Sequence, residues 1–418
     1  MRWFVVFMMF LASMMNYMDR SALSVAAPLI MKDLGLNLAQ RGMVFSSFFL
    51  GYALFNFIGG VLADKYGPRA TFAAAMGLWS GFCALTAGAF NFLSLMVIRI
   101  FFGMGEGPCS STANKMVYNW FPRREAASAV GVLSAGTPLG GAVSGPVVIF
   151  LAITFGWRLS FVCIGILGIV WMLAWLKFTT DKPEGHPKIG ETEQTLSNNL
   201  SVEIKNPDKK KIAYYLRHPT VLATALAFFG YNYTLFFFLT WFPTYLTDVH
   251  HLSLKSMSLV NSIPWILGFI GLAAGGFISD SIFKMTGNAL FSRKIVLSVC
   301  LAAAALCVAL AGTMSNNLPG AVALMSTSIF FLYLTGSIYW AIIQDSVQGE
   351  SIGSVGGFVH FLANTSGVIG PALTGFIVQT SGSYYAAFVL AGGISILGSA
   401  GVALFVKDEP PICAEARG

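Results

Sequence analysis

Residues 59–69 read Gly59-Gly60-Val61-Leu62-Ala63-Asp64-Lys65-Tyr66-Gly67-Pro68-Arg69, and the pattern of the first six recurs as Gly275-Gly276-Phe277-Ile278-Ser279-Asp280. The pair Gly145-Pro146 recurs in the same way as Gly370-Pro371. Such glycine pairs are common in apolar helices, but the aspartate that closes both six-residue matches indicates an internal repeat. Two parallel repeats are typical of membrane transporters that bind their substrate between two similar halves.

The composition places these repeats in a membrane. Of the 418 residues, 56% are hydrophobic and 10% are charged, whereas about 25% are charged in an average soluble domain. So few charges cannot cover the surface of a soluble protein of this size, which excludes a cytosolic enzyme, a secreted disulfide scaffold and a disordered regulator. The net charge of +7 is spread over loops and forms no basic groove, so no nucleic-acid partner is expected.

The apolar runs predict an all-α membrane protein with twelve spanning helices. A helix needs about 20 apolar residues to cross the hydrocarbon core of a bilayer. The runs have helical lengths, whereas a barrel would show alternating stretches of about ten residues. The predicted spans are residues 3–31, 40–64, 69–90, 93–117, 126–152, 156–178, 217–247, 254–283, 292–313, 318–343, 350–380 and 382–406.

The longest polar stretch divides these spans into six and six. The predicted organisation is a six-helix bundle (1–178), a central loop (179–216), a second six-helix bundle (217–406) and a short tail (407–418). Lys and Arg are concentrated in the loops on one side of the spans, which marks that side as cytoplasmic. We therefore expect both termini and the central loop in the cytoplasm, with the lysines of the loop near membrane lipid.

Four strongly ionisable residues lie deep in the predicted spans: Asp19, Arg20, Arg99 and Glu106. Each costs about 2.5–3.5 kcal/mol on insertion scales, so such residues persist where they pair, line a wet cavity or act in transport. A guanidinium binds a carboxylate through two parallel hydrogen bonds, which makes the two arginines candidates for holding an anionic substrate. The two carboxyl groups are candidates for carrying a proton. The alternative is a static ion pair that fastens span 1 to span 4.

Helical geometry relates the four residues to one another. Arg99 and Glu106 are seven residues apart, nearly two helical turns, so both side chains are expected on one face of span 4. Asp19 and Arg20 are adjacent and diverge by about 100° around span 1. These two neighbours are therefore expected to contact different helices.

The stretch from Gly60 to Arg69 resembles the signature that the major facilitator superfamily carries between spans 2 and 3. The resemblance covers the whole chain and implies two six-helix bundles that alternate between two conformations. A charge latch at one end of the bundles is then expected from Gly60, Asp64, Gly67 and Arg69, with Asp280 in the second half. The alternative for Asp64 is a topology anchor formed with its basic neighbours.

A narrower resemblance is carried by 16–20 (NYMDR), 99–108 (RIFFGMGEGP) and 240–246 (TWFPTYL). These stretches are similar to the anion:cation symporter family, and most of all to its bacterial sugar-acid carriers of the galactonate and glucarate type. The resemblance implies proton-coupled uptake of a small organic anion across the bacterial inner membrane. It implies that Asp19 and Glu106 couple protons and that Arg20, Tyr52 and Arg99 line the substrate cavity.

Further polar and aromatic residues are candidates for the wall of the same cavity. Tyr231 lies in span 7, Trp340 in span 10, and His360 and Asn364 share a face of span 11 at a spacing of four. As hydroxyl-binding groups they favour a polyhydroxylated acid, such as an aldonate, aldarate or hexuronate. The alternative is helix packing and hydrogen bonds between helices. Thr137 and His360 stand where the galactonate carriers have Gln and Asn, which leaves the particular anion open.

Other functions remain as alternatives to proton-coupled uptake. The same fold could carry an anion exchanger or a carrier of aromatic or dicarboxylic acids. A membrane enzyme would need a metal cluster, a DDxxD-type site or a nucleophile with its base, and the sequence offers none, since the loop pair His250-His251 is too little for a metal site. We therefore expect no enzymatic activity, no cofactor and no metal, and a carrier that functions as a monomer.

Overall fold

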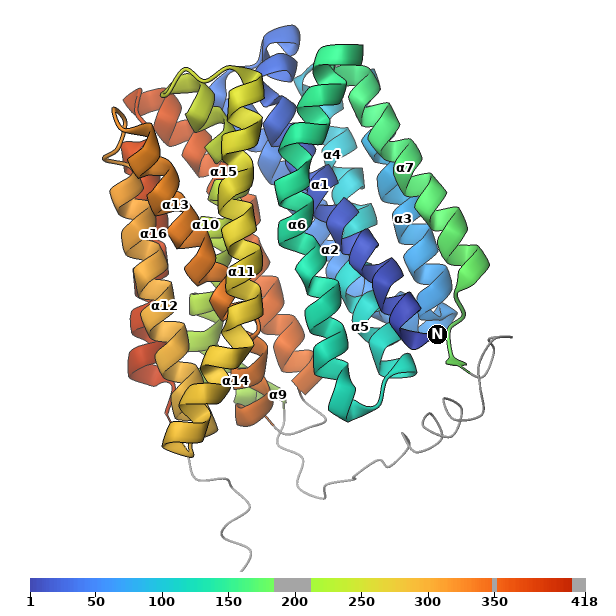
Figure 1. The fold of residues 1–418 in the computed structure, drawn as a ribbon, viewed down its shortest axis with the longest axis vertical. Coiled ribbons are helices and arrows are strands. Elements are labelled where there is room, and N and C mark those ends of the chain that lie inside the picture. Colours follow the sequence, from blue (N-terminus) through green and yellow to red (C-terminus); the bar gives the residue numbers. More distant parts are fainter. Residues whose placement is uncertain (184–211, 348–351, 408–418) are drawn as a thin grey trace, which may run out of the picture.

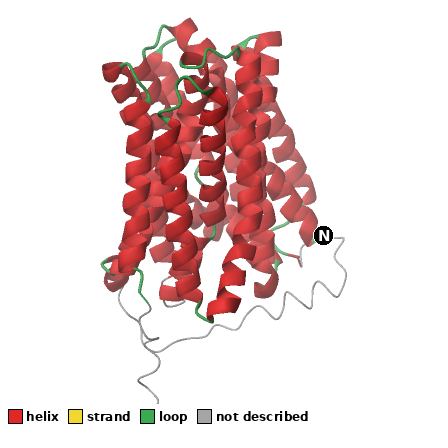
Figure 2. Ribbon diagram, turned by 60° about the vertical axis from the view of Figure 1, so that its left-hand side comes forward, coloured by secondary structure: helices red, strands yellow, loops and turns green. Residues whose placement is uncertain are grey.

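The computed structural model describes residues 1–183, 212–347 and 352–407, and all regular secondary structure within these ranges is helical (Figures 1 and 2). Most of the predicted central loop (179–216) and of the tail (407–418) lies outside the described residues. The helices run side by side along the long axis. Those that precede the central loop lie on the right of Figure 1, and those that follow it lie on the left.

The helices form two groups. The N-terminal group consists of α1 (Arg2–Leu34), α2 (Leu38–Tyr66), α3 (Pro68–Leu85), the short η1 (Thr86–Gly88), α4 (Phe92–Glu106), α5 (Cys109–Trp120), α6 (Arg123–Phe155) and α7 (Trp157–Phe178). The C-terminal group consists of α9 (Ile212–Leu216), α10 (Pro219–Asp248), α11 (Leu254–Thr286), α12 (Ala289–Ala311), α13 (Leu318–Thr335), α14 (Ile338–Ser346), α15 (Ile352–Ser381) and α16 (Tyr385–Phe405).

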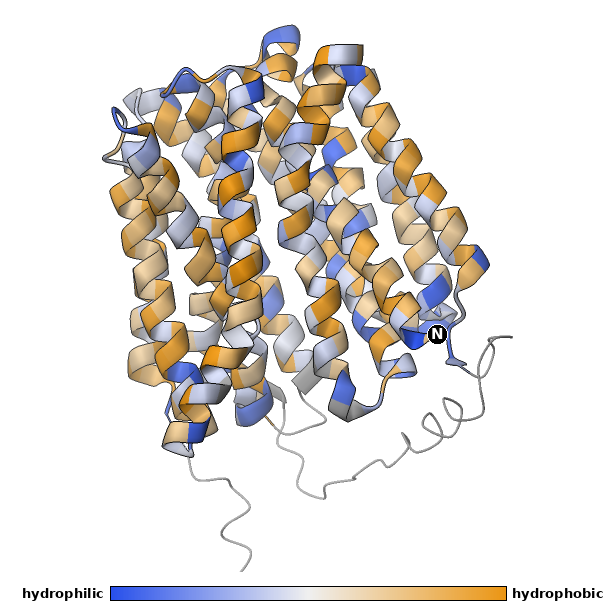
Figure 3. Cartoon of the chain, viewed as in Figure 1, coloured by the Kyte–Doolittle hydropathy of each residue, from blue (hydrophilic) through white to orange (hydrophobic). Residues whose placement is uncertain are grey.

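Ten helical segments within the described residues are long and apolar enough to cross a membrane. Helix α2 makes an eleventh if its two parts, Leu38–Asn56 and Ile58–Tyr66, which meet at 42°, count as one span. Of the twelve predicted spans, the remaining one is α1. It has 33 residues, but Asp19 and Arg20 in its middle lower its hydropathy. Apolar residues predominate along the outer surface of the helices, and polar residues gather at their ends (Figure 3).

Two of the predicted spans contain a break that the sequence analysis missed. Span 93–117 consists of α4 and α5, which are separated at Gly107-Pro108, because proline has no N–H and its ring clashes with the carbonyl four residues before it. Span 318–343 consists of α13 and α14, where the Gly336 N–H bonds the Tyr333 carbonyl in a tighter turn. The fourth helix of each group is therefore broken, as a repeat predicts.

Close helix packing sets the position of the charged residues in the N-terminal group. Helix α1 packs on α6, α2 on α4, and α3 on both α4 and α7. Between α2 and α4 the backbones nearly touch, since a Cβ at Gly103 would collide with the Phe48 carbonyl oxygen. Small residues at such crossings are typical of membrane helices. This close contact holds the end of α4, with Arg99 and Glu106, against α2.

The two groups join through α2 against α15, α6 against α11, and α1 against α10. The hydrogen bonds between the two groups gather toward the end of the bundle opposite to the start of α1, which we call the far end. There the Ala39 N–H donates to Gln379 Oε1 at 2.8 Å, and the Ala372 N–H donates to Ser46 Oγ at 2.9 Å. Between α11 and α6, Ser262 Oγ donates to the Ala142 carbonyl at 2.6 Å.

A polar cluster completes the far-end contact. Arg41 of α2 is buried, and its Nη1 lies 4.0 Å from Asp248 Oδ2 of α10. The Tyr384 hydroxyl donates to the same carboxylate oxygen at 2.9 Å. Burial beside the Asp248 carboxylate raises the pKa of Tyr384, so this hydroxyl keeps its proton and remains a donor. The cluster therefore links α2 of one group to α10 and the start of α16 of the other.

Candidate functional site

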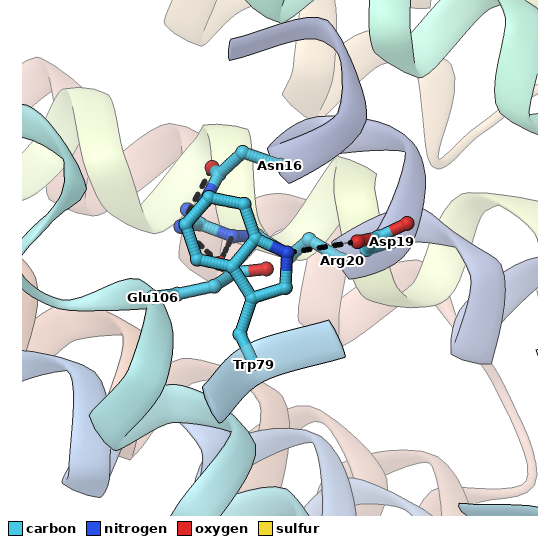
Figure 4. A network of polar contacts seen from close by, with 5 residues as sticks. All are labelled: Asn16, Asp19, Arg20, Trp79 and Glu106. Atoms are coloured by element: carbon cyan, nitrogen blue, oxygen red, sulfur yellow. Dashed lines mark hydrogen bonds and ion pairs between the residues drawn. The ribbon is translucent and has the colours of Figure 1, made fainter. Parts of the chain in front are cut away.

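The centre of the candidate site is an ion pair between α1 and α4. Arg20 donates to Glu106 Oε2 from Nη2 at 2.8 Å and from Nε at 3.2 Å. Its Nη2 also donates to Asn16 Oδ1, one helical turn back on α1, at 3.3 Å (Figure 4). Arg20 is 6% exposed and Glu106 is fully buried. A buried charge that loses its partner typically costs about 3–5 kcal/mol, so each of these two residues depends on the other.

Aromatic rings surround the Arg20 guanidinium. Its Cζ lies 4.7 Å from the ring centre of Tyr52, 4.9 Å from that of Phe48 and 5.1 Å from that of Tyr17. The electron-rich ring faces attract a cation most strongly where water is excluded. None of the three hydrogen bonds of Arg20 uses Nη1, which leaves donors for an anionic ligand. The structure thus places Tyr52 beside Arg20.

Arg99 of α4 is also surrounded by aromatic rings. Its Cζ lies 4.5 Å from the ring centre of Phe102 and 4.9 Å from that of Phe48, and the side chain is 3% exposed. Arg99 and Glu106 are both buried on α4, but the salt-bridge partner of Glu106 is Arg20 and not Arg99. In this conformation Arg99 therefore contacts aromatic rings, and it shares one of them, Phe48, with Arg20.

Asp19 points away from its neighbour Arg20, as the helical geometry predicts. It is 1% exposed, and the Trp79 Nε1–H of α3 donates to its Oδ2 at 3.2 Å (Figure 4). Asp19 Oδ1 and Glu106 Oε1 have no hydrogen-bond partner within the described part of the chain. Each carboxyl group therefore has one oxygen that a proton can occupy without breaking an existing hydrogen bond.

The C-terminal group provides an aromatic and amide-bearing wall. The Phe228 ring stacks on Tyr339 at 4.5 Å, and Tyr231 contacts both rings. The His360 ring lies 5.7 Å from Phe228 and 5.8 Å from Trp340.

This wall faces the ion pair. His360 is within electrostatic range of Arg20, and Tyr231 is within that range of Tyr17. Buried Asn364 donates from Nδ2 to the His360 carbonyl at 2.8 Å, while Trp340 is 38% exposed. The predicted residues of α10, α14 and α15 thus lie together, opposite the charged face of α1.

Thr137 lies on α6 at intermediate burial, and its Oγ1 donates to the Ser134 carbonyl of the same helix at 2.8 Å. This local hydrogen bond occupies the hydroxyl proton but leaves the oxygen lone pairs for a ligand donor. Thr137 takes no part in the hydrogen bonds of the Arg20–Glu106 pair.

The predicted latch residues lie at the end of the bundle where α1 begins. The Asp64 side chain is 67% exposed and pairs with Lys115 Nζ of α5 at 2.8 Å, within the N-terminal group. Gly60 lies one turn before Asp64 on α2, and a Cβ there would lie 3.9 Å from Ser111 Cβ of α5, an ordinary van der Waals contact. The Asp280 side chain lies outside the described residues. The described part of the latch therefore shows a contact between α2 and α5.

The turn after Asp64 is fixed by Gly67 and Arg69. Gly67 has a φ of +85°, which side chains rarely adopt, and a Cβ there would lie 2.7 Å from Asp181 Oδ1. The Arg69 N–H donates to that carboxylate at 2.8 Å, and its guanidinium donates to the Leu176 carbonyl. This turn thereby ties the start of α3 to the end of α7.

Sequence reasoning missed several residues of the site. Asn16 stood within a quoted motif but was given no role, and Trp79 and Phe48 carry no charge or unusual spacing that would mark them. Their contacts depend on how the helices are rotated about their axes, which the sequence does not reveal. For metals, no group of three or more His, Cys, Asp or Glu side chains in the described ranges is placed to hold an ion.

Membrane-spanning helices in two similar groups, with a buried ion pair where the groups meet, define a polytopic membrane transport protein. The family model described as Major Facilitator Superfamily matches residues 9–367, and the chain belongs to that superfamily. The resemblance carried by residues 60–69 is thereby confirmed. The protein is a transporter and not an enzyme.

Relatives and a solved structure agree with this assignment. The chain is 53% identical over 416 residues to the hexuronate transporter of Bacillus subtilis, covering 99% of this chain and 96% of that protein. It is 31% identical to the probable L-galactonate transporter of Escherichia coli, covering 96% and 88%. A bacterial homologue of the human lysosomal transporter Spinster shares the fold, with a TM-score of 0.76, 19% identity and coverage of 98% and 99%.

Proposed function

We propose that this protein takes up a sugar acid, in the first place a hexuronate, together with protons. The observation that carries this proposal is the buried Arg20–Glu106 pair, a cation suited to a carboxylate next to a group that can take a proton. The names of the relatives supply the substrate class, since one is a hexuronate transporter and another is a probable L-galactonate transporter.

The chemistry follows from competition for one guanidinium. While Glu106 is ionised, it holds Arg20 by two charge-assisted hydrogen bonds to a single oxygen. Protonation of Glu106 removes its charge and frees Arg20 for the substrate carboxylate. After the anion leaves, Glu106 releases its proton and regains Arg20. Proton and anion therefore bind together and leave together, which is the basis of symport.

Alternating access follows from rocking of the two groups, as in other transporters built from repeats. We assign twelve spans, with α1 and bent α2 among them, and both chain ends in the cytoplasm. The far end is then periplasmic and closed by the contacts of Ser46, Ser262 and Arg41, so this conformation faces the cytoplasm. Opening toward the periplasm requires these contacts to separate. In this proposal the protein lies in the bacterial inner membrane.

A bulky residue at the far-end contact is expected to prevent closure. A Cβ at Gly145 of α6 would lie 2.5 Å from the Ser258 carbonyl oxygen of α11, a backbone atom that cannot move aside cheaply. Gly145→Leu should therefore hold the protein open at the far end and lower uptake about ten-fold or more. The measurement is uptake, together with labelling of a cysteine at Ser46 by an impermeant thiol reagent, which should increase.

Gly131→Leu on the same helix is the matched control, because a Cβ there meets nothing within 4 Å. It should leave both uptake and labelling as in the wild type. Unchanged labelling in Gly145→Leu would contradict the assignment of the far end as the periplasmic gate.

The aromatic wall gives the substrate a second candidate. Phe228, Tyr231, Tyr339 and the exposed Trp340 could stack on an aromatic acid as well as on the apolar face of a sugar ring. The amide of Asn364 and the His360 ring favour hydroxyl groups. Uptake of glucuronate, galactonate and benzoate into proteoliposomes under an inward proton gradient separates these candidates. Glucuronate should accumulate most, and accumulation of benzoate alone would overturn the sugar-acid proposal.

A further inference from the structure

Trp79 donates a hydrogen bond to Asp19, one of the two proposed proton carriers. It lies in α3, is fully buried, and its indole N–H donates to Asp19 Oδ2 at 3.2 Å. Within the described part of the chain, no other donor reaches the Asp19 carboxylate, since Oδ1 has no partner. The single hydrogen bond of this buried carboxyl group thus comes from α3, and not from α1 or α4, which carry the ion pair.

Close packing fixes the indole in place. At Gly105 of α4, a Cβ would lie 2.6 Å from the Trp79 backbone nitrogen, so α3 and α4 are in backbone contact at this level. Gly105 directly precedes Glu106, the partner of Arg20. The same crossing therefore positions the donor to Asp19 and the carboxylate of the ion pair.

Other tryptophans of this group use their indole differently. Trp171 donates to the Met8 carbonyl and Trp175 to the Arg69 carbonyl, each at 3.1 Å. These acceptors are backbone oxygens that do not titrate, which is the ordinary way to satisfy a buried indole. Trp157 also donates to a carboxylate, Asp33, but that carboxylate is 43% exposed and paired with Arg158. Trp79 differs in that its acceptor is a buried carboxyl group.

Three ionisable side chains interact electrostatically with Asp19 within the described part of the chain. Glu106 and Arg99 of α4 and Cys83 of α3, one turn after Trp79, interact with it electrostatically. Helix α6, which packs along α1, brings the Ser144 hydroxyl to the Met18 carbonyl at this level. An indole N–H is a donor only, so it stabilises the ionised carboxylate and cannot accept a proton from the neutral acid.

We propose that Trp79 is a positioning residue for proton coupling: it holds Asp19 Oδ2, leaves Oδ1 for the proton, and thereby sets the pH at which Asp19 loads and releases it. This inference rests on the proposed function, in which Asp19 carries a proton. It assigns a role in coupling to α3, a helix that provides none of the hydrogen bonds of Arg20 described above.

The test is the pH dependence of uptake by Trp79→Phe in proteoliposomes. Phenylalanine keeps an aromatic ring but removes the donor, so the ionised form of Asp19 loses stabilisation and keeps its proton to higher pH. The pH of half-maximal uptake should rise by about one unit. Trp171→Phe is the matched control, since it removes an indole N–H from a carbonyl acceptor, and its pH profile should match the wild type.

A second variant keeps the tryptophan and covers the case in which Trp79→Phe does not fold. Gly105→Ala places a methyl group against the Trp79 backbone and should displace the indole from Asp19, which raises the pH of half-maximal uptake in the same direction. A wild-type pH profile in either folded variant would overturn the inference.

Asp19→Asn separates this inference from the proposed function. In the Asp19→Asn background, adding Trp79→Phe should cause no further change in the pH dependence of uptake. If Asp19→Asn alone retained normal proton-driven uptake, the proposed role of Asp19 would fail, and the role of Trp79 with it. If Asp19→Asn lost proton drive but Trp79→Phe kept the wild-type profile, the role of Trp79 alone would fail.

Discussion

Arg20→Ala is expected to abolish substrate binding, because this substitution removes the guanidinium that the anion takes over from Glu106. The substitution affects both the substrate-bound state and the empty state in which Glu106 is ionised. The substrate carboxylate loses its charge-assisted hydrogen bonds, and Glu106 remains buried without a cation. An uncompensated buried charge costs about 3–5 kcal/mol, so the melting temperature should fall as well. Calorimetric titration of the purified protein with a hexuronate measures the first effect, and thermal unfolding measures the second.

Three further variants separate binding from folding. Arg20→Lys keeps the charge but not the planar fork, and its affinity should fall about ten-fold or more. Arg20→Ala combined with Glu106→Ala removes both charges, so stability should recover while binding stays lost. Arg158→Ala, which breaks a half-exposed pair with Asp33, should leave binding unchanged. Wild-type affinity in Arg20→Ala would show that the anion is held elsewhere.

Glu106→Gln is expected to uncouple transport from the proton gradient. Glutamine is a neutral isostere that imitates the protonated acid at every pH, so Arg20 is permanently free for the anion. Exchange of labelled for unlabelled substrate at fixed pH should persist, whereas accumulation driven by a pH gradient should fall to the level without a gradient. Uptake and counterflow in proteoliposomes measure the two activities side by side.

The control for this variant is another glutamate in the same group. Glu125→Gln changes a partly exposed carboxylate that pairs with Arg2 near the start of α6, and it should keep proton-driven accumulation. If Glu106→Gln accumulated substrate as the wild type does, Glu106 would be a structural partner of Arg20 and not a coupling group.

The sequence predicted the charged centre because burying Asp19, Arg20 and Glu106 in a membrane is costly enough to be noticed. It also predicted that Asp19 and Arg20 contact different helices, which the structure shows as contacts with Trp79 and Glu106. It did not predict that Arg20, and not Arg99, is the partner of Glu106. That choice depends on how α1 and α4 are rotated and how closely they approach, and both depend on packing between distant segments.

The breaks in the fourth helix of each group show a second limit of sequence reasoning. Hydropathy continues across Gly107-Pro108 and Gly336-Ser337, so the apolar runs appear unbroken, although local chemistry ends the helix. Conversely, α1 has the length of a span but not the hydropathy, because polar residues lie in its middle. In both cases the departure from a simple apolar helix coincides with residues that build the site.

Proton movement with the substrate tests the central claim most directly. Proteoliposomes that contain the protein and an enclosed pH-sensitive dye, with equal pH on both sides, receive a hexuronate on the outside. The account predicts that the lumen acidifies as substrate enters, and that Glu106→Gln takes up substrate without this acidification. Entry of substrate into wild-type vesicles with no change of internal pH would contradict it.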